Sequence, residues 1–231
     1  EAAAAPRAPE AFLGWFAALK ENGPGQGDPL HPWLAQHATW PQLRWFLHQE
    51  VAGEAGFDDL VAMTQVKLPE RAKLEMARNY WDEMGRGTVE TMHGRMLRLL
   101  AVHLDLKPTV EDTVWESLTL SNLMMGLAAN RRYAWHSVGA LGVIELTAPT
   151  RVGHVDAALM RHGFSADLRR YFTVHSVLDV KHSQAWNAEV IAPAVARDPE
   201  VATAIAEGAL MRLHAGARCF ARYRAELGAP G

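Results

Sequence analysis

The chain has 231 residues, of which 49% are hydrophobic and 21% charged, and its formal net charge is -3 at pH 7. This length suits one ordinary globular domain or two small ones, and the charge argues against nucleic-acid binding. The single cysteine, Cys219, excludes a disulfide framework and a cysteine-ligated metal cluster. No apolar run is long enough for a membrane helix, and residues 1–10 lack the features of a signal peptide. We therefore expect a soluble cytoplasmic protein without a membrane partner.

Helical periodicity runs through most of the chain, with Gly and Pro between the periodic segments. Residues 1–10 are rich in Ala and Pro and predict a disordered tail before one helical domain over residues 11–231. In that domain we expect helices over residues 11–20, 31–37, 42–65, 69–84, 88–106, 114–130, 133–146, 150–162, 165–191 and 199–227. Thr88 is expected to cap a helix, and Pro149 and Pro193 are expected to end two others. Strand signals are nearly absent and the connections are short, so the predicted fold is an all-α bundle.

The most informative stretch is His175, Asp179 and His182, at positions i, i+4 and i+7. On a helix these three side chains lie within about 60° of one another over two turns. Phe172 and Trp186 nearby are apolar, so this face is predicted to point inward. Burying three such groups is costly unless they pair or bind a cation, and their spread suits two adjacent metals. The structural alternative is a hydrogen-bonded His–Asp pair beside a core histidine.

A second candidate group surrounds the Gly85-Arg86-Gly87 break. Because the break resets the helical register, Glu83 before it and His93 after it can converge. Glu90 offers another interpretation, since Glu-x-x-His on one helix is a spacing used in di-iron bundles. We favour Glu83, because an acid at a helix start, such as Glu90, already suits the helix dipole. A solvated surface carboxylate remains the simple alternative for either residue.

Three further carboxylates are candidate ligands. Glu145 is the one acid in an apolar helix, so it is either a ligand or lies in water at the helix end. Glu50 and Glu54 share a helical face, and either could be an accessory ligand or part of a solvated acidic surface. Oxygen and imidazole ligands without thiolate favour iron or manganese over structural zinc. Together the candidates could hold two Fe(II) ions with open positions for O₂.

In this order the motifs resemble the haem-oxygenase-like di-iron oxidases and oxygenases. That family includes an alkene-forming fatty acid decarboxylase, an N-nitrosourea-forming oxygenase and a para-aminobenzoate synthase. The resemblance covers residues 31–220 and implies a haem-oxygenase-like helical bundle. It is carried by Asp82-Glu83-Met84-Gly85 with His93, by Gly142-Val143-Ile144-Glu145, and by His175-x-x-x-Asp179-x-x-His182 with Trp186.

The resemblance implies two bound Fe(II) ions and O₂ as co-substrate. It implies six ligands, which would also be the catalytic residues: Glu83, His93, Glu145, His175, Asp179 and His182. Glu54 would be an extra carboxylate, and Glu90 competes with Glu83. The expected reaction is N-oxygenation, desaturation or oxidative C–C cleavage of a small molecule derived from an amino acid, an amine or a fatty acid. Such a reaction belongs to a biosynthetic pathway, and a homodimer is compatible with the sequence.

Other functions of the same fold stay open. A haem-binding member could use His31 or His37, and a thiaminase-like member would need a cysteine nucleophile, for which Cys219 is poorly placed. A cofactor-free enzyme or a non-catalytic helical binding protein would use the polar residues as acid/base groups or as buried pairs.

Four apolar residues are candidates for lining a substrate pocket. Ordinary core packing is the structural alternative for each, because aromatic and methionine side chains mostly serve that role. The candidates are Trp81, Met124, Trp135 and Phe172. Arg86, Arg131 or Arg132 could hold a substrate carboxylate, with ordinary solvation as the alternative.

Overall fold

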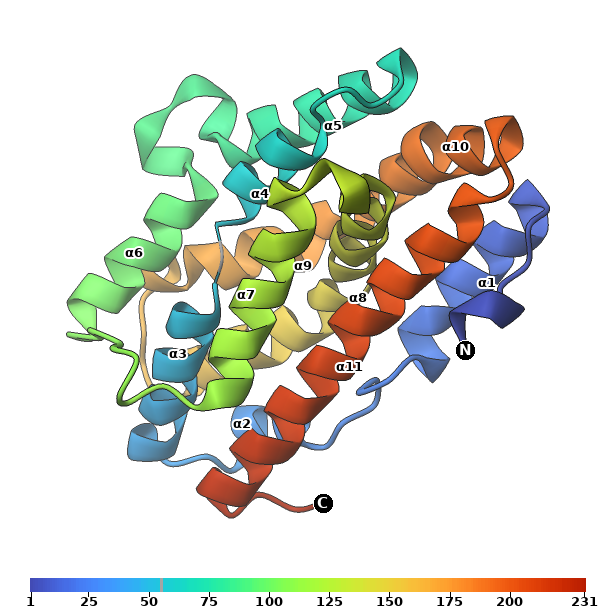
Figure 1. Ribbon diagram of the computed structural model, residues 1–231. Helices are drawn as coiled ribbons and strands as arrows, with labels where there is room; N and C mark the ends of the chain where they lie inside the picture. Colours follow the sequence, from blue (N-terminus) through green and yellow to red (C-terminus); the bar gives the residue numbers. More distant parts are fainter. Residues whose placement is uncertain (55) are drawn as a thin grey trace.

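The computed structural model describes residues 1–54 and 56–231, which form helices joined by loops, with no strand among them (Figure 1). The main helices are α1 (Pro9–Asn22), α2 (Leu30–Gln36), α3 (Trp40–Gly53), α4 (Phe57–Thr64), α5 (Glu70–Glu83), α6 (His93–His103), α7 (Trp115–Ala129), α8 (Ala134–Arg161), α9 (Ala166–Trp186), α10 (Ala192–Arg197) and α11 (Val201–Leu227). Short 3₁₀ turns η1 (Ala2–Ala4), η2 (Gly85–Gly87), η3 (Val89–Thr91) and η4 (Arg131–Tyr133) and a π turn, η5 (Asn187–Ile191), complete the chain. The all-α bundle is confirmed.

The centre of the bundle is α8, which makes its most extensive contacts with α9 and α11. Two glycines let the backbones of α8 and α11 touch. A Cβ at Gly139 would lie 1.9 Å from the Ile205 carbonyl oxygen, and one at Gly208 would lie 1.8 Å from the His136 carbonyl oxygen. Side chains at these crossing points would therefore force the two helices apart.

A third glycine fixes α9 against α8. A Cβ at Gly142 would come within 2.8 Å of the indole ring of Trp186, which is 1% exposed. The indole Nε1–H donates a 3.1 Å hydrogen bond to the Val138 carbonyl oxygen. Since Glu145 follows Gly142 by one turn and His182 precedes Trp186 by one turn, this contact sets how these two side chains face each other.

The first ten residues are not the disordered tail that their composition predicts. Residues 2–4 form η1 against α11, and Ala5 is 8% exposed within the core. Glu1 forms a 3.0 Å ion pair with His214. Ala is only weakly hydrophobic, so this segment does not stand out in the sequence as part of the core. Its small side chains nevertheless allow close packing on α11.

Several helix boundaries also differ from the prediction. The stretch over residues 42–65 forms two helices, α3 and α4, and Gly56 before α4 has a left-handed φ of 74°. Thr88 does not cap α6: residues 85–91 form two 3₁₀ turns, and α6 begins at His93. The cause is the Gly85-Arg86-Gly87 segment, in which all three residues have positive φ.

The two prolines expected to end helices do not do so. Pro149 lies inside α8, where its ring lacks the N–H that would bond to the carbonyl of Glu145. Packing of α8 against α9 and α11 keeps the helix continuous. After Trp186 the chain continues through the π turn, in which the Ala192 N–H bonds to the Asn187 carbonyl oxygen. Pro193 then falls in the first turn of α10, where its missing N–H costs nothing.

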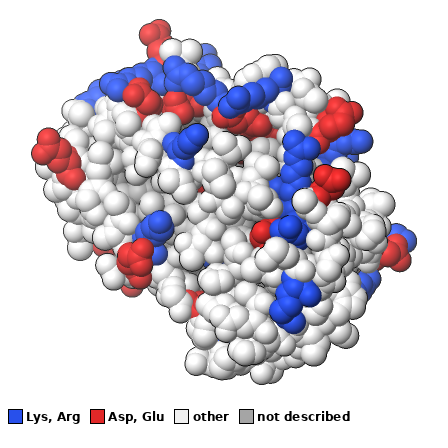
Figure 2. All heavy atoms as spheres, turned by 180° about the vertical axis from the view of Figure 1, so that it is seen from behind, with Lys and Arg blue, Asp and Glu red and all other residues white. Residues whose placement is uncertain are grey.

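On the surface, basic and acidic side chains are interspersed around a broad neutral area on the face seen from behind (Figure 2). Among the described helices, none is long and apolar enough to cross a membrane.

The close crossing of α8 and α11 predicts opposite effects for two glycine substitutions in the same helix. Gly139→Ala places a methyl group against the Ile205 carbonyl and should lower the free energy of unfolding by about 1–3 kcal/mol. Gly153→Ala meets nothing within 4 Å and should raise it by up to ~1 kcal/mol through better helix propensity. Urea unfolding followed by circular dichroism checks both. Equal midpoints for the two variants would contradict the proposed crossing.

Candidate metal centre

Two groups of buried acids and histidines lie along α9. The first ligand group consists of Glu83, His93 and His175, and the second of Glu145, Asp179 and His182. Within each group the potential ligand atoms all lie within 4.8 Å of one another. Helix α9 contributes to both groups, because His175, Asp179 and His182 follow one another at one-turn intervals on one face.

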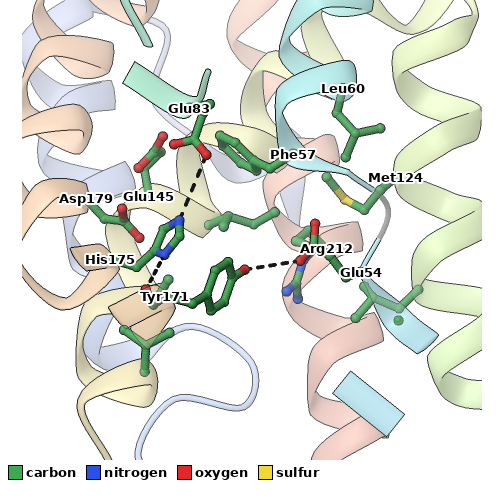
Figure 3. A pocket seen from close by; sticks show the side chains of 15 residues that line it. Glu54, Phe57, Leu60, Glu83, Met124, Glu145, Tyr171, His175, Asp179 and Arg212 are labelled. Atoms are coloured by element: carbon green, nitrogen blue, oxygen red, sulfur yellow. Dashed lines mark hydrogen bonds and ion pairs between the residues drawn. The ribbon is translucent and has the colours of Figure 1, made fainter. Parts of the chain in front are cut away.

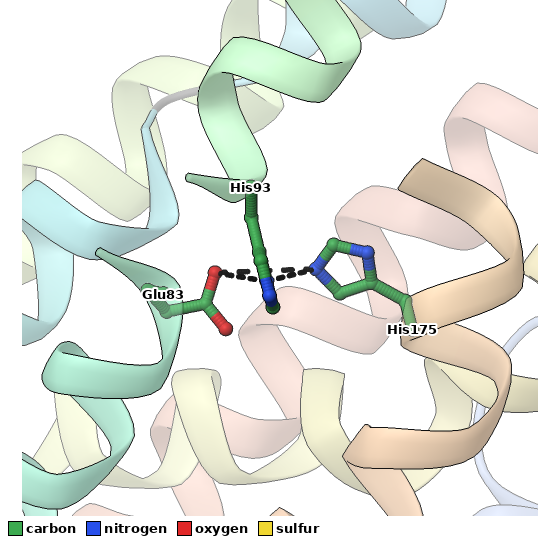
Figure 4. Close-up of side chains that lie close together, drawn as sticks. All are labelled: Glu83, His93 and His175. Atoms are coloured by element: carbon green, nitrogen blue, oxygen red, sulfur yellow. Dashed lines mark hydrogen bonds and ion pairs between the residues drawn. The ribbon is translucent and has the colours of Figure 1, made fainter. Parts of the chain in front are cut away.

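In the first ligand group, three side chains from three helices point at a common centre (Figure 4). Glu83 Oε2 lies 2.8 Å from His93 Nδ1 and 3.9 Å from His175 Nε2, and the two imidazole nitrogens are 3.0 Å apart. Neighbouring ligands of a metal with bonds of about 2.1 Å are separated by about 3 Å. The spacing of these three atoms therefore matches a coordination shell.

The orientation of His175 is fixed by its other ring nitrogen. His175 Nδ1 donates a 2.7 Å hydrogen bond to the carbonyl oxygen of Tyr171, one turn earlier on α9. This bond leaves Nε2 to face the first ligand group. A backbone carbonyl in this role is typical of metal-binding histidines, whose tautomer it sets.

The second ligand group contains buried polar atoms that lack partners. His182 Nδ1 lies 3.5 Å from Glu145 Oε2 but makes no hydrogen bond, and neither does Asp179 Oδ1. Glu145 and Asp179 are 2% and 3% exposed. Buried polar atoms are rarely left unpaired, so these atoms fit a cation that would satisfy them.

Two side chains that the sequence did not single out support the second ligand group. Asp82 Oδ2 accepts a 3.2 Å hydrogen bond from His182 Nε2, which turns Nδ1 toward Glu145. Asp82 also pairs with Arg86 in the Gly-Arg-Gly turn, at 2.7 Å. Asn79 Nδ2 donates a 2.6 Å bond to Glu145 Oε1. In the sequence, Asp82 could have been noticed only by its position next to Glu83. The hydrogen bond that it accepts from His182 depends on how α5 packs against α9.

The charges of the two groups are strongly coupled. Burial raises the pKa of Glu83, but the interactions with His175 and His93 outweigh this and lower it to about 2. Burial opposes the charged form of His175, yet Glu83 and Asp179 raise its pKa to about 9. For His182, Glu145 and Asp82 likewise outweigh burial and raise the pKa to about 9. Burial and the charge of Glu145 raise the pKa of Asp179 to about 8.

The structure thus brings together all six residues expected as ligands. It places the other two candidates, Glu54 and Glu90, outside the two ligand groups. Glu90 lies exposed on η3, outside both groups, because the 3₁₀ turns replace the helix that would have aligned it with His93. Glu54 lies outside both groups but lines the cavity next to His175. Its carboxylate accepts hydrogen bonds from the Gly56 N–H, at 3.1 Å, and from the Tyr171 hydroxyl, at 3.4 Å.

A cavity of about 110 Å³ adjoins the ligands (Figure 3). The carboxylates and imidazole of the two ligand groups lie at one end, and Leu60, Leu120, Met124 and Ile144 form apolar walls. Met124 is thus a lining residue, as expected, and Phe172 lines the continuation of the cavity. A more open groove between α4 and α6 reaches His93 and His175 from outside.

Two expected pocket residues do not belong to this cavity. Trp81 is 53% exposed, since it lies about 200° around α5 from the inward-facing Glu83. Its indole instead covers Gly87. Trp135 lines a separate surface cleft with Pro69 and Val190, on the far side of α8.

His31, His37 and Cys219 are the residues that other functions of the fold would use. His31 is 5% exposed and packs edge-on against the ring of Phe220, at the far end of the cavity from the ligands. His37 is on the surface. Burial raises the pKa of the Cys219 thiol to about 12, which disfavours the reactive thiolate.

Comparison with known proteins identifies the relatives of this arrangement. The family model for iron-containing redox enzymes matches residues 44–217, which include all six ligand residues. The chain belongs to this family. Membership of this family indicates an iron-containing oxidoreductase, and the two candidate groups are residues that could hold a metal ion.

Two crystal structures of a CADD-like protein of unknown function from Nostoc punctiforme share the fold. One has a TM-score of 0.72 at 18% identity, covering 95% of this chain and 98% of that chain. The other has a TM-score of 0.68 at 18% identity, covering 96% of each chain. At this identity the likeness establishes the fold alone, which confirms the predicted haem-oxygenase-like bundle. No curated protein matches the sequence.

The raised pKa values predict that metal affinity increases with pH. Near pH 7, His175, His182 and Asp179 all tend to hold a proton that a metal must displace. Raising the pH from 6 to 8 weakens this competition, by roughly tenfold in affinity per pH unit for each proton displaced. A metal at the second ligand group displaces protons from both His182 and Asp179. Its affinity should therefore rise more steeply with pH than the affinity of the first ligand group. Anaerobic Fe(II) titration against a competing chelator measures both slopes, and pH-independent binding would contradict the assignment.

Proposed function

We propose that this protein is a non-haem di-iron enzyme that uses O₂ to oxidise a small organic substrate in a biosynthetic pathway. The observation that carries the proposal is the placement of two three-residue ligand groups side by side along α9, next to a cavity. Three histidines and three carboxylates without thiolate form a donor set suited to iron, and helix bundles build carboxylate-rich di-iron sites in this way.

In this proposal Glu83, His93 and His175 hold one iron, and Glu145, Asp179 and His182 hold the other. Bound iron would supply the electrons that reduce O₂ for oxidation of the substrate. The protein groups provide the remaining requirements. The Tyr171 carbonyl and Asp82 orient the two α9 histidines, and Glu54, held by Tyr171, provides a further carboxylate at the cavity wall.

In this proposal the substrate lies in the cavity beside the ligands. The ligand carboxylates lie at one end of the cavity, and apolar walls together with Glu54, Tyr171 and Arg212 line the rest of it (Figure 3). A small molecule in this cavity would present a C–H or N–H bond to the irons. Desaturation, oxidative C–C cleavage and N-oxygenation are the reactions that this placement accommodates.

A pair of isosteric variants tests the proposal. Glu83→Gln removes a charged ligand from the first group, so it should bind fewer irons and lose most Fe(II)-dependent O₂ consumption. Glu90→Gln alters an exposed carboxylate seven residues later and should match the unmodified protein in both measurements. Iron is measured by elemental analysis after anaerobic loading, and O₂ consumption with an oxygen electrode.

The outcomes separate the proposed enzyme from its alternatives. Absence of bound iron and of O₂ consumption in the unmodified protein would favour a cofactor-free enzyme or a binding protein. Loss in Glu90→Gln with Glu83→Gln intact would overturn the assignment of the first ligand group.

A further inference from the structure

The cavity beside the ligands has a continuation that none of the six ligands borders. This second part, of about 140 Å³, shares Glu54, Tyr171 and Arg212 with the first part and extends between α3, α8 and α11. The apolar side chains common to both parts are Leu120, Ile144, Ala148 and Val152. A ligand lying along these side chains would therefore have one end near the metal centre and the other in the second part.

The second part contains two arginines, Arg151 from α8 and Arg212 from α11. Among the described residues, neither guanidinium has a carboxylate within ion-pair distance, whereas Arg161 and Arg169 on α8 and α9 both have well-defined partners. Arg151 reaches only the Thr147 hydroxyl, at 3.5 Å. The Nε atoms of Arg151 and Arg212 are both buried without a hydrogen-bond partner. A buried nitrogen donor without an acceptor is costly, so these two side chains would gain from an anion in the cavity.

Neighbouring residues hold these side chains in place. The Arg151 guanidinium carbon lies 5.5 Å from the centre of the Phe220 ring, a cation–π distance. Gly216 makes room for Arg212, because a Cβ there would come within 2.8 Å of Arg212 Nη1. Burial and the charge of Arg212 lower the pKa of Arg151 to about 10, which still leaves it protonated at pH 7. Two close positive charges favour an anion near both.

Glu50, from α3, also lines this space. Within the part of the chain that the structure describes it forms no ion pair with either arginine; burial raises its pKa, and the charges of Arg151 and Arg212 oppose that rise. Glu54, nearer to the ligands, already accepts the bonds from Gly56 and Tyr171. The donors of the two guanidinium groups are thus left largely available for an external anion.

We propose that Arg151 and Arg212 bind the carboxylate of a small organic acid whose apolar chain lies along Ile144, Ala148 and Val152 toward the metal ligands. Guanidinium groups match a carboxylate with paired N–H donors, and the apolar wall suits an aliphatic chain.

The three arginines that the sequence suggested do not serve this purpose: Arg86 pairs with Asp82, Arg131 donates to the Thr64 carbonyl, and Arg132 is exposed. Only the orientation of the ligand's apolar chain toward the metal ligands rests on the proposed function. The carboxylate site itself needs no metal.

Calorimetry with hexanoate tests this assignment on the full chain, both iron-loaded under anaerobic conditions and after removal of metal with a chelator. Hexanoate should bind in both states, at least tenfold more tightly than hexan-1-ol or hexylamine. Arg151→Gln and Arg212→Gln should each weaken hexanoate binding at least tenfold. Arg218→Gln, on the exposed face of α11, is the matched control and should not change it.

Three results would overturn the proposal: equal binding of hexanoate and hexan-1-ol, wild-type affinity in both glutamine variants, or competition by phosphate as strong as that by hexanoate. The last result would mean a site for inorganic anions. Circular dichroism verifies folding of the variants, and Arg151→Lys and Arg212→Lys, which keep the charge, replace any glutamine variant that does not fold. Hexanoate binding without iron binding would refute the di-iron function while leaving the carboxylate site intact.

Discussion

Six ionisable side chains converge in the middle of the bundle, and the arrangement of the surrounding helices depends on them. Three carboxylates and three largely buried histidines must be arranged against one another, since an uncompensated buried charge costs several kcal/mol. The helices that carry them must therefore be held in fixed register. The glycine contacts of α8 with α11 and the Trp186 indole over Gly142 provide that register.

The end of α5 serves both ligand groups through two consecutive residues. Glu83 points into the first group, while Asp82 orients His182 of the second. A carboxylate at a helix C-terminus is disfavoured by the helix dipole, and here histidines compensate for it. The left-handed Gly85-Arg86-Gly87 turn reverses the chain so that His93 meets Glu83, and Arg86 in that turn pairs with Asp82. One strained turn thus connects the two groups.

The predictable part of the site is the part that lies on one helix. His175, Asp179 and His182 share a face of α9 by their spacing alone, and an acid in the apolar sequence around Glu145 indicated burial. Glu83 was preferred to Glu90 from the dipole argument and the chain break. Asp82, Asn79 and the two cavity arginines were not predictable, because their roles arise from contacts between helices that are distant in sequence.

The fold shows the same division between local and tertiary causes. Helical periodicity predicted nearly every helix, but local rules failed at Pro149 and Pro193, where packing and a π turn keep the chain helical. They failed again at residues 1–10, where tertiary contacts order a segment with weak local preference.

If the two ligand groups hold two metal ions side by side, both ions will be seen directly in crystals of the protein loaded anaerobically with Fe(II) and measured at the iron absorption edge. We expect two anomalous peaks per chain, one among Glu83, His93 and His175 and the other among Glu145, Asp179 and His182. One peak, or peaks at other residues, would contradict this assignment.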